Sequence, residues 1–440
     1  MNADISTRAH WLMGYGLPRA TLKLLARTGD PFAQLLIDSS QPKNVYHLVE
    51  QIRERGRMYA AVGGSVWVTA DGQIVRDVLR DNRFRTINPS ERSPFRVVRR
   101  MLAKTDPNPD GLNGMESRSL LVTDPPEHAR LRSLVSRAFT PRAIDGLRHR
   151  IQEIANTLLN DLNDNTHCDL RADYASRIPI EVIAEMLGIP RDEIPELYAL
   201  AEPGTRLLMT TAPSWQDFRT GMAALRGYEG SIAAHIERLR RHGGDDSILS
   251  AVLQDGDLTD AEVKMFGSVL LGAGFLTTAH SFGNAIVALV SHPDQLARLQ
   301  AHPEGWPNAV EETLRYDSVL QVAVRVATET IQIDGHTVRE GSAINLLIGG
   351  ANRDPAIFER PDEFDTTRAN ARDHISFGTG IHVCLGAALA RMELQIGLQA
   401  LFERFPQLTL AGEPTLDNIT LMRGIKQLPV NLGPARVNTG

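Results

Sequence analysis

The chain has 440 residues, with 47 Lys and Arg against 53 Asp and Glu and a net charge of -6 at pH 7. This balance argues against nucleic acid as a partner, because binding to phosphates needs a positive surface. The two cysteines, Cys168 and Cys384, lie far apart in the sequence and give no disulfide framework, so we expect a reducing compartment, the cytoplasm.

The N-terminal segment has no apolar run long enough for a signal peptide, because Asp4, Arg8, Arg19 and Lys23 interrupt it. Trp11 to Leu36 is typical of an amphipathic helix, which we expect to pack on its own domain rather than on a membrane. No linker, low-complexity segment or internal repeat divides the chain. We therefore predict one domain, 1–440, with 1–45 as an extension packed on it.

Asp124 to Arg132 is typical of a loop that stops at prolines and opens a helix. His128 and Arg132 are four residues apart and share a face of that helix. Both side chains can donate hydrogen bonds to an anionic oxygen, although each alone would equally suit a solvated surface.

The longest uncharged run, Met265 to Pro293, follows a capping box formed by Thr259 and Glu262. Its length would suit a membrane span, but its polar residues favour a helix buried on all sides. Within it, Ala273 and Gly274 are small and leave space. The Thr277 hydroxyl can bond to the carbonyl of Ala273 or hold a water.

Glu312 and Arg315 are three residues apart on a predicted helix, a spacing that usually forms a weak surface ion pair. β-Structure is predicted as hairpins, at Tyr59 to Thr69, Thr330 to Val338 and Ile419 to Leu432. Many helices with a few short strands predict a mainly α (α+β) fold, with small β-sheets at one side.

Cys384 lies in a glycine-rich loop, Phe377 to Gly386, directly before an amphipathic helix predicted from Leu385 to Phe402. The helix N-terminus favours an anion, so we expect the thiol to ionise more readily than a free one. One thiolate is too few for a structural zinc site, whereas an iron held by four ring nitrogens needs one axial ligand. The alternative is an ordinary buried cysteine.

The loop resembles the haem-binding signature of the cytochrome P450 superfamily, soluble bacterial type, which has Phe, Gly, Gly, a basic residue, Cys and Gly at this spacing. The resemblance implies haem b with Cys384 as the iron ligand. It also implies cofactor contacts from His128, Arg132, Arg325, Phe377, Gly378, His382 and Gly386, of which His128, Arg132, Arg325 and His382 would bind the propionates. Behind the haem loop it implies a buried structural triad of Glu312, Arg315 and Arg368.

The implied activity is that of a monooxygenase, inserting one oxygen atom from O2 into an apolar organic substrate. The implied catalytic residues are Thr277, Ala273, Gly274 and Thr278, on the oxygen-binding segment. Electrons would come from a separate ferredoxin and ferredoxin reductase with NAD(P)H, and we expect a monomer. The resemblance implies a substrate pocket formed by Thr86 to Ser119, the segment around Leu200 to Trp215, the helix at Leu270 to Thr277, and Val322 with Ala323. The residues there are mostly apolar, namely Ile87, Leu207, Leu208, Met209, Leu271, Phe275 and Val322.

Leu276 departs from the family pattern, because the position before the threonine usually holds an acid that delivers protons. Protons could instead pass through Thr277, Thr278 and ordered water, which we favour, or through a substrate hydroxyl, or the enzyme could leak peroxide. Peroxide-driven oxidation or rearrangement therefore stays open as an alternative function. We disfavour a non-enzymatic haem sensor, because the chain has no room for an output module.

Overall fold

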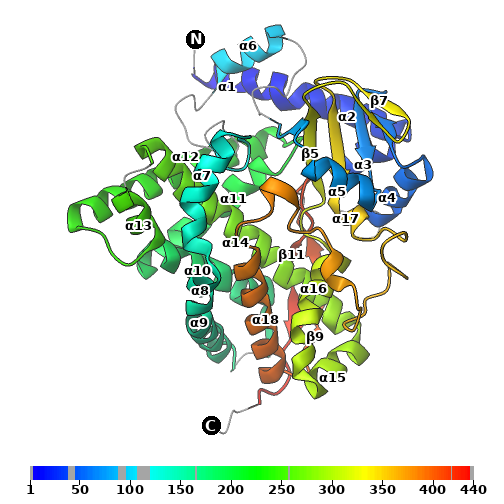
Figure 1. The fold of residues 1–440 in the computed structure, drawn as a ribbon. Helices are drawn as coiled ribbons and strands as arrows, with labels where there is room; N and C mark the ends of the chain where they lie inside the picture. Colours follow the sequence, from blue (N-terminus) through cyan, green and yellow to red (C-terminus); the bar gives the residue numbers. More distant parts are fainter. Residues whose placement is uncertain are drawn as a thin grey trace.

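The structure is a computed structural model that describes residues 3–37, 45–87, 96–106, 119–163, 166–255, 258–417 and 419–436. Helices form most of the molecule, and a smaller region rich in β-strands lies at one side (Figure 1). The prediction of a mainly α fold with small sheets at one side is confirmed.

Helix α14, Asp260–Ser291, passes through the centre of this helical mass (Figure 1). It begins with the predicted capping box, in which the Thr259 hydroxyl accepts from Glu262 N and the Glu262 carboxylate accepts from Thr259 N. Among the described residues α14 is the one helix long and apolar enough to cross a membrane, and 67% of its apolar window is buried inside the molecule. It packs against α10 (Arg177–Leu187), α11 (Ile194–Leu208), α12 (Trp215–His242), α16 (Trp306–Tyr316) and α18 (Ala387–Arg404).

The other helices cover the outside of this core and the sheet region (Figure 1). They include α4 (Val45–Glu54), α5 (Gly72–Arg80), α7 (Glu127–Ser136), α8 (Pro141–Gly146), α9 (Arg148–Asp161), α13 (Ile248–Asp255), α15 (Pro293–Ala301) and α17 (Ile348–Ala351).

The main sheet has five strands in the order β1-β2-β8-β5-β3, with bounds Tyr59–Ala61, Val66–Thr69, Ala343–Leu347, Val322–Ala327 and Phe84–Arg85. The predicted hairpin β1–β2 is confirmed, and so is the hairpin of β6 (Ile331–Ile333) with β7 (His336–Val338). The sequence did not predict β5 and β8, which form the centre of the sheet. These strands lie on either side of the β6–β7 hairpin in the sequence and pair with each other across it.

The third predicted hairpin, Ile419 to Leu432, is wrong. Strand β11 (Ile425–Gln427) pairs with β10 (Thr415–Leu416), whereas β12 (Pro429–Asn431) pairs with β4 (His167–Asp169) and β9 (Thr409–Leu410). Only Leu428 separates β11 from β12, which is too short for a two-residue hairpin turn. Each strand therefore finds its partners elsewhere.

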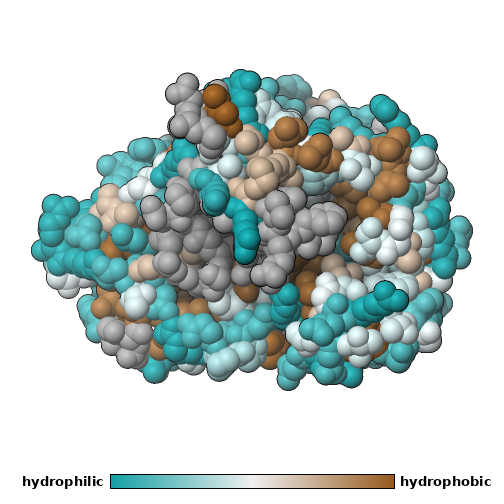
Figure 2. All heavy atoms as spheres, turned by 90° about the horizontal axis from the view of Figure 1, so that it is seen from above, coloured by the Kyte–Doolittle hydropathy of each residue, from teal (hydrophilic) through white to brown (hydrophobic). Residues whose placement is uncertain are grey.

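The N-terminal helices α1 (Ala3–Trp11), α2 (Leu17–Arg27) and α3 (Pro31–Ile37) lie with α6 (Arg96–Thr105) at the end of the molecule seen in Figure 2. Trp11 Nε1 donates to the carbonyl of Pro213, and its ring lies 5.7 Å from that of Trp215. These contacts support the proposal that 1–45 packs on a single domain, 1–440. Residues 1–2 and 38–44 of that extension lie outside the described residues. Apolar side chains of this face stay exposed, namely Ile5, Leu12, Leu17, Leu24 and Met101.

Candidate active site

A cavity of about 410 Å³ lies beside α14, between that helix and the loop that precedes α18. Its wall contains the four predicted catalytic residues of α14, Ala273, Gly274, Thr277 and Thr278. It also contains most of the predicted cofactor residues, namely Arg132, Arg325, Phe377, Gly378, His382, Cys384 and Gly386. The structure therefore brings together segments that are more than 100 residues apart in the sequence.

The α14 side of the cavity presents hydroxyl groups beside small residues. Thr277 Oγ1 donates to the carbonyl of Ala273 at 2.7 Å, and Ser281 Oγ donates to the carbonyl of Thr277 at 2.9 Å. A Cβ at Gly274 would lie 2.9 Å from Ile183 Cδ1 of α10. Gly274 therefore allows α14 and α10 to pack closely, in addition to leaving the open space that we predicted.

The loop around Cys384 requires glycine at two positions. Gly378 and Gly380 have φ angles of 69° and 75°, and a Cβ at Gly380 would lie 2.6 Å from the carbonyl oxygen of Leu79. The Cys384 amide donates to the carbonyl of Phe377 at 2.9 Å, which closes the turn. The thiol is thereby held open to the cavity.

The expectation that the Cys384 thiol ionises readily is wrong for the protein alone. Burial raises the pKa of the thiol, and the Gly386 amide with Arg132 and Arg391 only partly offsets this. Helix α18 begins at Ala387, three residues after the cysteine, so its N-terminus is not directly at the sulfur. A bound metal cation would supply the missing stabilisation, because a coordinating thiol is deprotonated.

Basic groups converge at a second part of the site. The His128 and His382 rings lie 4.2 Å apart. The Nε2 atom of His128 is buried without a hydrogen-bond partner, and that of His382 lies 3.5 Å from Asp124 Oδ1. Burial, with His382 and Arg132 nearby, lowers the pKa of His128 to about 4. Burial also lowers the pKa of the Arg132 and Arg325 guanidiniums, which shows that each charge is poorly solvated there.

These features fit haem b. The buried His128 nitrogen without a partner and two poorly solvated arginines suit the carboxylates of the propionates. A Cβ at Gly386 would meet no protein atom within 4 Å, which leaves room for a flat ring beside the backbone. The thiol of Cys384 opens on the same cavity. Fold and site together define a haem-thiolate protein.

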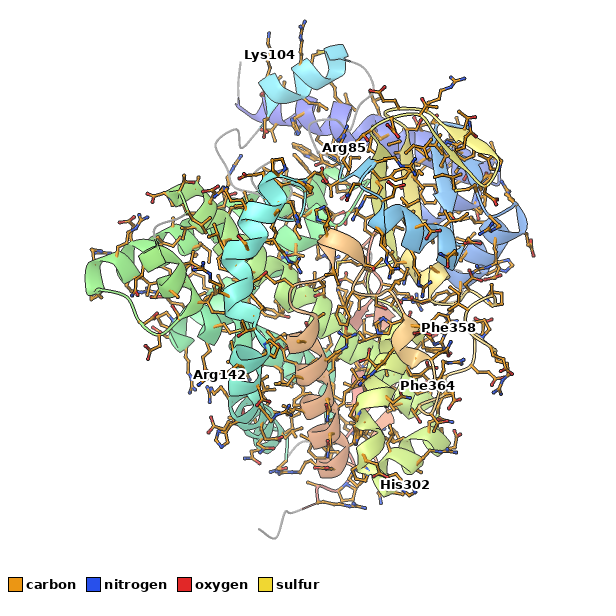
Figure 3. All side chains as sticks on the ribbon, in the orientation of Figure 1. Arg85, Lys104, Arg142, His302, Phe358 and Phe364 are labelled. Carbon is orange, nitrogen blue, oxygen red and sulfur yellow. The ribbon has the colours of Figure 1, made fainter. Side chains whose placement is uncertain are left out.

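The predicted triad is buried behind the loop. Arg315 Nε donates to Glu312 Oε2 at 2.7 Å, and Arg368 Nε donates to the same oxygen at 3.1 Å. Glu312 and Arg315 are fully buried, so the weak surface pair is excluded. Both guanidiniums also donate to backbone carbonyls of the irregular segment 352–368, and Phe358 and Phe364 of that segment lie beside α16 (Figure 3).

Sequence reasoning missed a second buried network next to the triad. Glu311 accepts from His374 Nε2 at 2.9 Å and from Arg391 Nε at 2.8 Å. Burial alone would raise the pKa of Glu311, but the bonds from His374 and Arg391 outweigh it and lower the pKa to about 2. Arg391 also lies over the ring of Phe377, 4.5 Å from its centroid. This network joins α16, the cysteine loop and α18.

Of the apolar residues that we predicted for the substrate pocket, Met209 lines the main cavity, whereas Ile87, Leu207, Leu208, Leu271, Phe275 and Val322 do not. Leu271 and Phe275 are fully buried on the core side of α14, because the cavity face of the helix is set by Ala273, Thr277 and Ser281. Val322 also faces a core cluster, since side chains alternate along β5 and its neighbour Ala323 takes the cavity side.

The remaining predicted pocket residues lie outside the main cavity. Leu207 packs against Phe218 and Leu225, and Leu208 lines a small adjoining cavity of about 40 Å³. Ile87 is half-buried and lies outside both cavities. Residues 88–95 and 107–118 of the predicted pocket segment lie outside the described residues.

The observed apolar lining comes from several elements that no short motif connects. It includes Leu120, Leu131, Val135, Ile183, Met209, Met265, Phe266, Val269, Leu270, Leu320, Ala323 and Met422. Glu393 of α18 lines the same cavity and was also missed. The sequence could have indicated it, because an acidic residue four positions after Leu389 falls on the apolar, buried face of the predicted helix.

Comparisons with known proteins agree with this site. A family model described as Cytochrome P450 matches residues 307–432. Cytochrome P450 140 of Mycobacterium tuberculosis is 35% identical over 438 residues, covering 98% of both chains. The Vitamin D(3) 25-hydroxylase of Pseudonocardia autotrophica is 39% identical over 324 residues, covering 72% of this chain and 78% of the relative.

Solved structures show the same likeness. P450BioI, crystallised with an acyl carrier protein ligated to hexadec-9Z-enoic acid, has a TM-score of 0.80 and 32% identity. That comparison covers 89% of this chain and 99% of P450BioI. The chain therefore belongs to the cytochrome P450 family. It is a haem-thiolate monooxygenase that uses haem b, O2, a small-molecule substrate and a redox partner.

Proposed function

We propose that this monooxygenase oxidises an apolar organic molecule with electrons from a ferredoxin and a ferredoxin reductase. The observation that carries the substrate class is the apolar part of the cavity wall apart from the haem-binding residues, which includes Leu120, Met209, Phe266, Val269 and Leu270. We further infer a monomer in the cytoplasm. The two free cysteines, Cys168 and Cys384, suit a reducing compartment.

Haem bound through Cys384 supplies the chemistry of O2 activation, and its thiolate favours O–O cleavage. The protein supplies position and protons. Arg132, Arg325, His128 and His382 would hold the propionates and so fix the ring against α14. The apolar wall orders the substrate and excludes bulk water.

The Thr277 hydroxyl is fixed by its bond to the Ala273 carbonyl, which leaves its oxygen able to accept from a water in the cavity. Thr278 lines the cavity beside it. We therefore assign proton delivery to these two hydroxyls with ordered water. The side chain of Leu276 has no ionisable group and is fully buried, so it cannot take part.

The proposed docking face for ferredoxin is the side of the molecule near the cysteine loop, where an acidic partner would meet arginines. Arg372 fits this role, because its side chain is 74% exposed. Arg137 is exposed as well. Arg130 is less suited, since Glu127 and Glu262 already pair with it.

Peroxide-driven oxidation or rearrangement is the second candidate, and the buried Leu276 is the observation that favours it. Purified holoprotein should be given apolar substrates, first with NAD(P)H, reductase and ferredoxin, and then with hydrogen peroxide alone. Product formed mainly with the ferredoxin system supports the proposal. Product formed only with peroxide overturns it in favour of the second candidate.

The partner's identity needs its own control. Raising the ionic strength should lower the rate with ferredoxin, because opposite charges on the two proteins are screened, and should leave the peroxide-driven rate unchanged. A rate that is independent of salt would contradict docking through arginines. Size-exclusion chromatography at several protein concentrations tests the monomer.

A further inference from the structure

The N-terminal helices present apolar side chains to solvent at one end of the molecule. The described residues include eight exposed large apolar side chains, and five of these belong to α1, α2, α6 and the turn between α1 and α2, namely Ile5, Leu12, Leu17, Leu24 and Met101. Figure 2 views this end, where apolar side chains lie among hydrophilic ones. Single exposed apolar residues need no explanation, whereas a group in one region marks an interaction surface.

A π-helical turn keeps four of these side chains in line. Helix α1 continues through this turn, Leu12–Gly16, into α2 without a break, so the three segments form one helical rod. Ile5 and Leu12 are seven residues apart, as are Leu17 and Leu24, so each pair shares a helix face. A spacing of five would rotate Leu17 by about 140° from Leu12 in an α-helix. The Leu17 amide instead donates to the Leu12 carbonyl, so one π-turn brings both residues onto the same side.

The other side of the rod is bound to the domain. The Tyr15 ring lies 5.4 Å from that of Phe218, and the Arg19 guanidinium donates to the carbonyl of Ala212. Together with the Trp11 contacts, these interactions fix the rotation of the rod. The four aligned apolar side chains are 48 to 61% exposed, so they are held outward.

Basic residues accompany this apolar line. Lys23 and Arg27 of α2 are exposed, and so are Arg100 and Lys104 of α6, which packs against α1. The rod contains four Lys and Arg against one acidic residue, and α6 contains four and no acidic residue, although the whole chain has a net charge of -6. This end is therefore a positive region of a negatively charged protein. Apolar and basic side chains on one helical surface are typical of helices that lie in a membrane interface.

We propose that the outer side of the rod and α6 bind the surface of an anionic lipid bilayer. The rod lies in the plane of the membrane, with its apolar line at the acyl boundary and its basic side chains at the headgroup phosphates. A second copy of the chain is a poorer match, because a two-fold contact brings the same basic side chains together. We predicted that this helix packs on its own domain rather than on a membrane. It packs there with one side, and the proposal concerns the other.

This surface lies next to a wall of the main cavity. Trp11 and Arg19 donate to the segment between α11 and α12, and Met209 at the start of that segment lines the cavity. Membrane binding would hold this wall near the bilayer, in which apolar molecules concentrate. The contact is peripheral, so it agrees with a cytoplasmic protein, and it does not depend on the proposed substrate class.

Sedimentation with lipid vesicles tests the proposal on the haem-loaded full chain. The wild type should bind vesicles of equal parts phosphatidylcholine and phosphatidylglycerol, and should bind phosphatidylcholine alone much more weakly. Added salt should weaken the binding, because it screens the attraction between the basic side chains and the headgroups.

Two double variants separate the apolar and the basic contributions. Leu17→Gln with Leu24→Gln should weaken binding to the mixed vesicles about 10-fold or more, because two apolar side chains no longer enter the bilayer. Lys23→Gln with Arg27→Gln should weaken it roughly 10- to 30-fold. Arg142→Gln with Arg241→Gln makes the same change in net charge at exposed positions of other helices and should leave binding unchanged. All three should keep the wild-type melting temperature and carbon monoxide band.

A second measurement locates the surface directly. Phosphatidylcholine with brominated acyl chains, mixed with phosphatidylglycerol, should quench the added fluorescence of Leu24→Trp, because that side chain enters the bilayer. Arg142→Trp, on α8, is the matched control and should show no added quenching.

The proposal is overturned if the wild type does not bind the mixed vesicles, if the two double variants of the rod bind as well as the wild type, or if Leu24→Trp is not quenched. Concentration-dependent dimerisation that Leu17→Gln with Leu24→Gln abolishes, without vesicle binding, would assign the surface to a second copy instead. A ferredoxin-driven rate that falls in Lys23→Gln with Arg27→Gln, without vesicle binding, would assign it to an acidic protein.

Discussion

Cys384 illustrates how one side chain depends on a group outside the chain. Within the protein alone, burial raises the pKa of its thiol. The other free cysteine, Cys168 on β4, also has its pKa raised, to about 12, by burial and by Asp173 and Asp169. The two differ in access, because the thiol of Cys384 opens on the large cavity.

We expect the dithionite-reduced holoprotein to show a strongly red-shifted Soret band with carbon monoxide, and Cys384→Ala to lose that band because the thiolate ligand is gone. Absorption spectra of both proteins check this. Cys168→Ala is the matched control and should keep the band. A band that survives Cys384→Ala would contradict thiolate ligation by this residue.

Leu276 cannot be exchanged for the acid that its position usually holds. Its side chain is fully buried in the main core and does not line the cavity. We expect Leu276→Asp to destabilise the protein by about 4 kcal/mol, since it leaves a buried acid without a partner. Urea unfolding measures this, with Leu276→Met as the control that should cost less than about 1.5 kcal/mol. A stable Leu276→Asp with tighter coupling would contradict the placement of Leu276 in the core.

Helix α16 connects the cysteine loop to the rest of the fold through two adjacent carboxylates that face different partners. Glu312 holds Arg315 and Arg368, which in turn bind carbonyls of the irregular segment. Glu311 holds His374 and Arg391, next to the loop and on α18. Helix α16 therefore supports the cysteine loop through the irregular segment and through α18.

We expect Glu312→Gln to lower the free energy of unfolding by about 3 to 5 kcal/mol and to reduce haem incorporation, because it leaves two buried guanidiniums without their carboxylate. Chemical denaturation and the ratio of haem to protein after purification check this. Glu304→Gln, on a side chain that is 77% exposed, should change stability by less than about 0.5 kcal/mol.

The Glu311 network should give a pH-dependent contribution to stability. The folded pKa of about 2 lies below the ordinary 4.5, so the contribution is complete above pH 4.5 and is lost as the pH falls toward 2. Denaturation of wild type and Glu311→Gln at several pH values checks this. The difference between them should shrink steadily as the pH falls from 4.5. A constant difference would contradict the lowered pKa.

The whole molecule is built around a cavity that the chain alone leaves open. The poorly solvated Arg132 and Arg325 border it, and the Cys384 thiol opens on it. Both features cost free energy until a matching group binds, so cofactor and fold should be strongly coupled.

Removal of haem should therefore lower the melting temperature, and added haem should restore it in proportion to the logarithm of its concentration. Binding to the folded state alone adds about 4 kcal/mol when free haem is 1,000 times its Kd. Calorimetry of apoprotein and holoprotein checks this. Equal melting temperatures would contradict the coupling.

Sequence alone determined what local patterns encode. The capping box at Thr259, the hairpin turns at Gly63-Gly64 and Asp334-Gly335, and the glycine-flanked Cys384 act over a few residues, so their structures could be predicted. The family resemblance added Arg368 and Arg325, which no local pattern distinguishes from surface charges.

Tertiary structure decided which face of each helix lines the cavity and which strands pair across the chain. Which residues of α14 face the cavity follows from its rotation against α10 and α18, so Phe275 lies in the core and Ser281 in the cavity wall. The pairing of β5 with β8 joins strands that the β6–β7 hairpin separates in the sequence. Burial raises the pKa of the Glu393 carboxyl to about 8, and burial by segments distant in the chain follows from no single stretch of sequence.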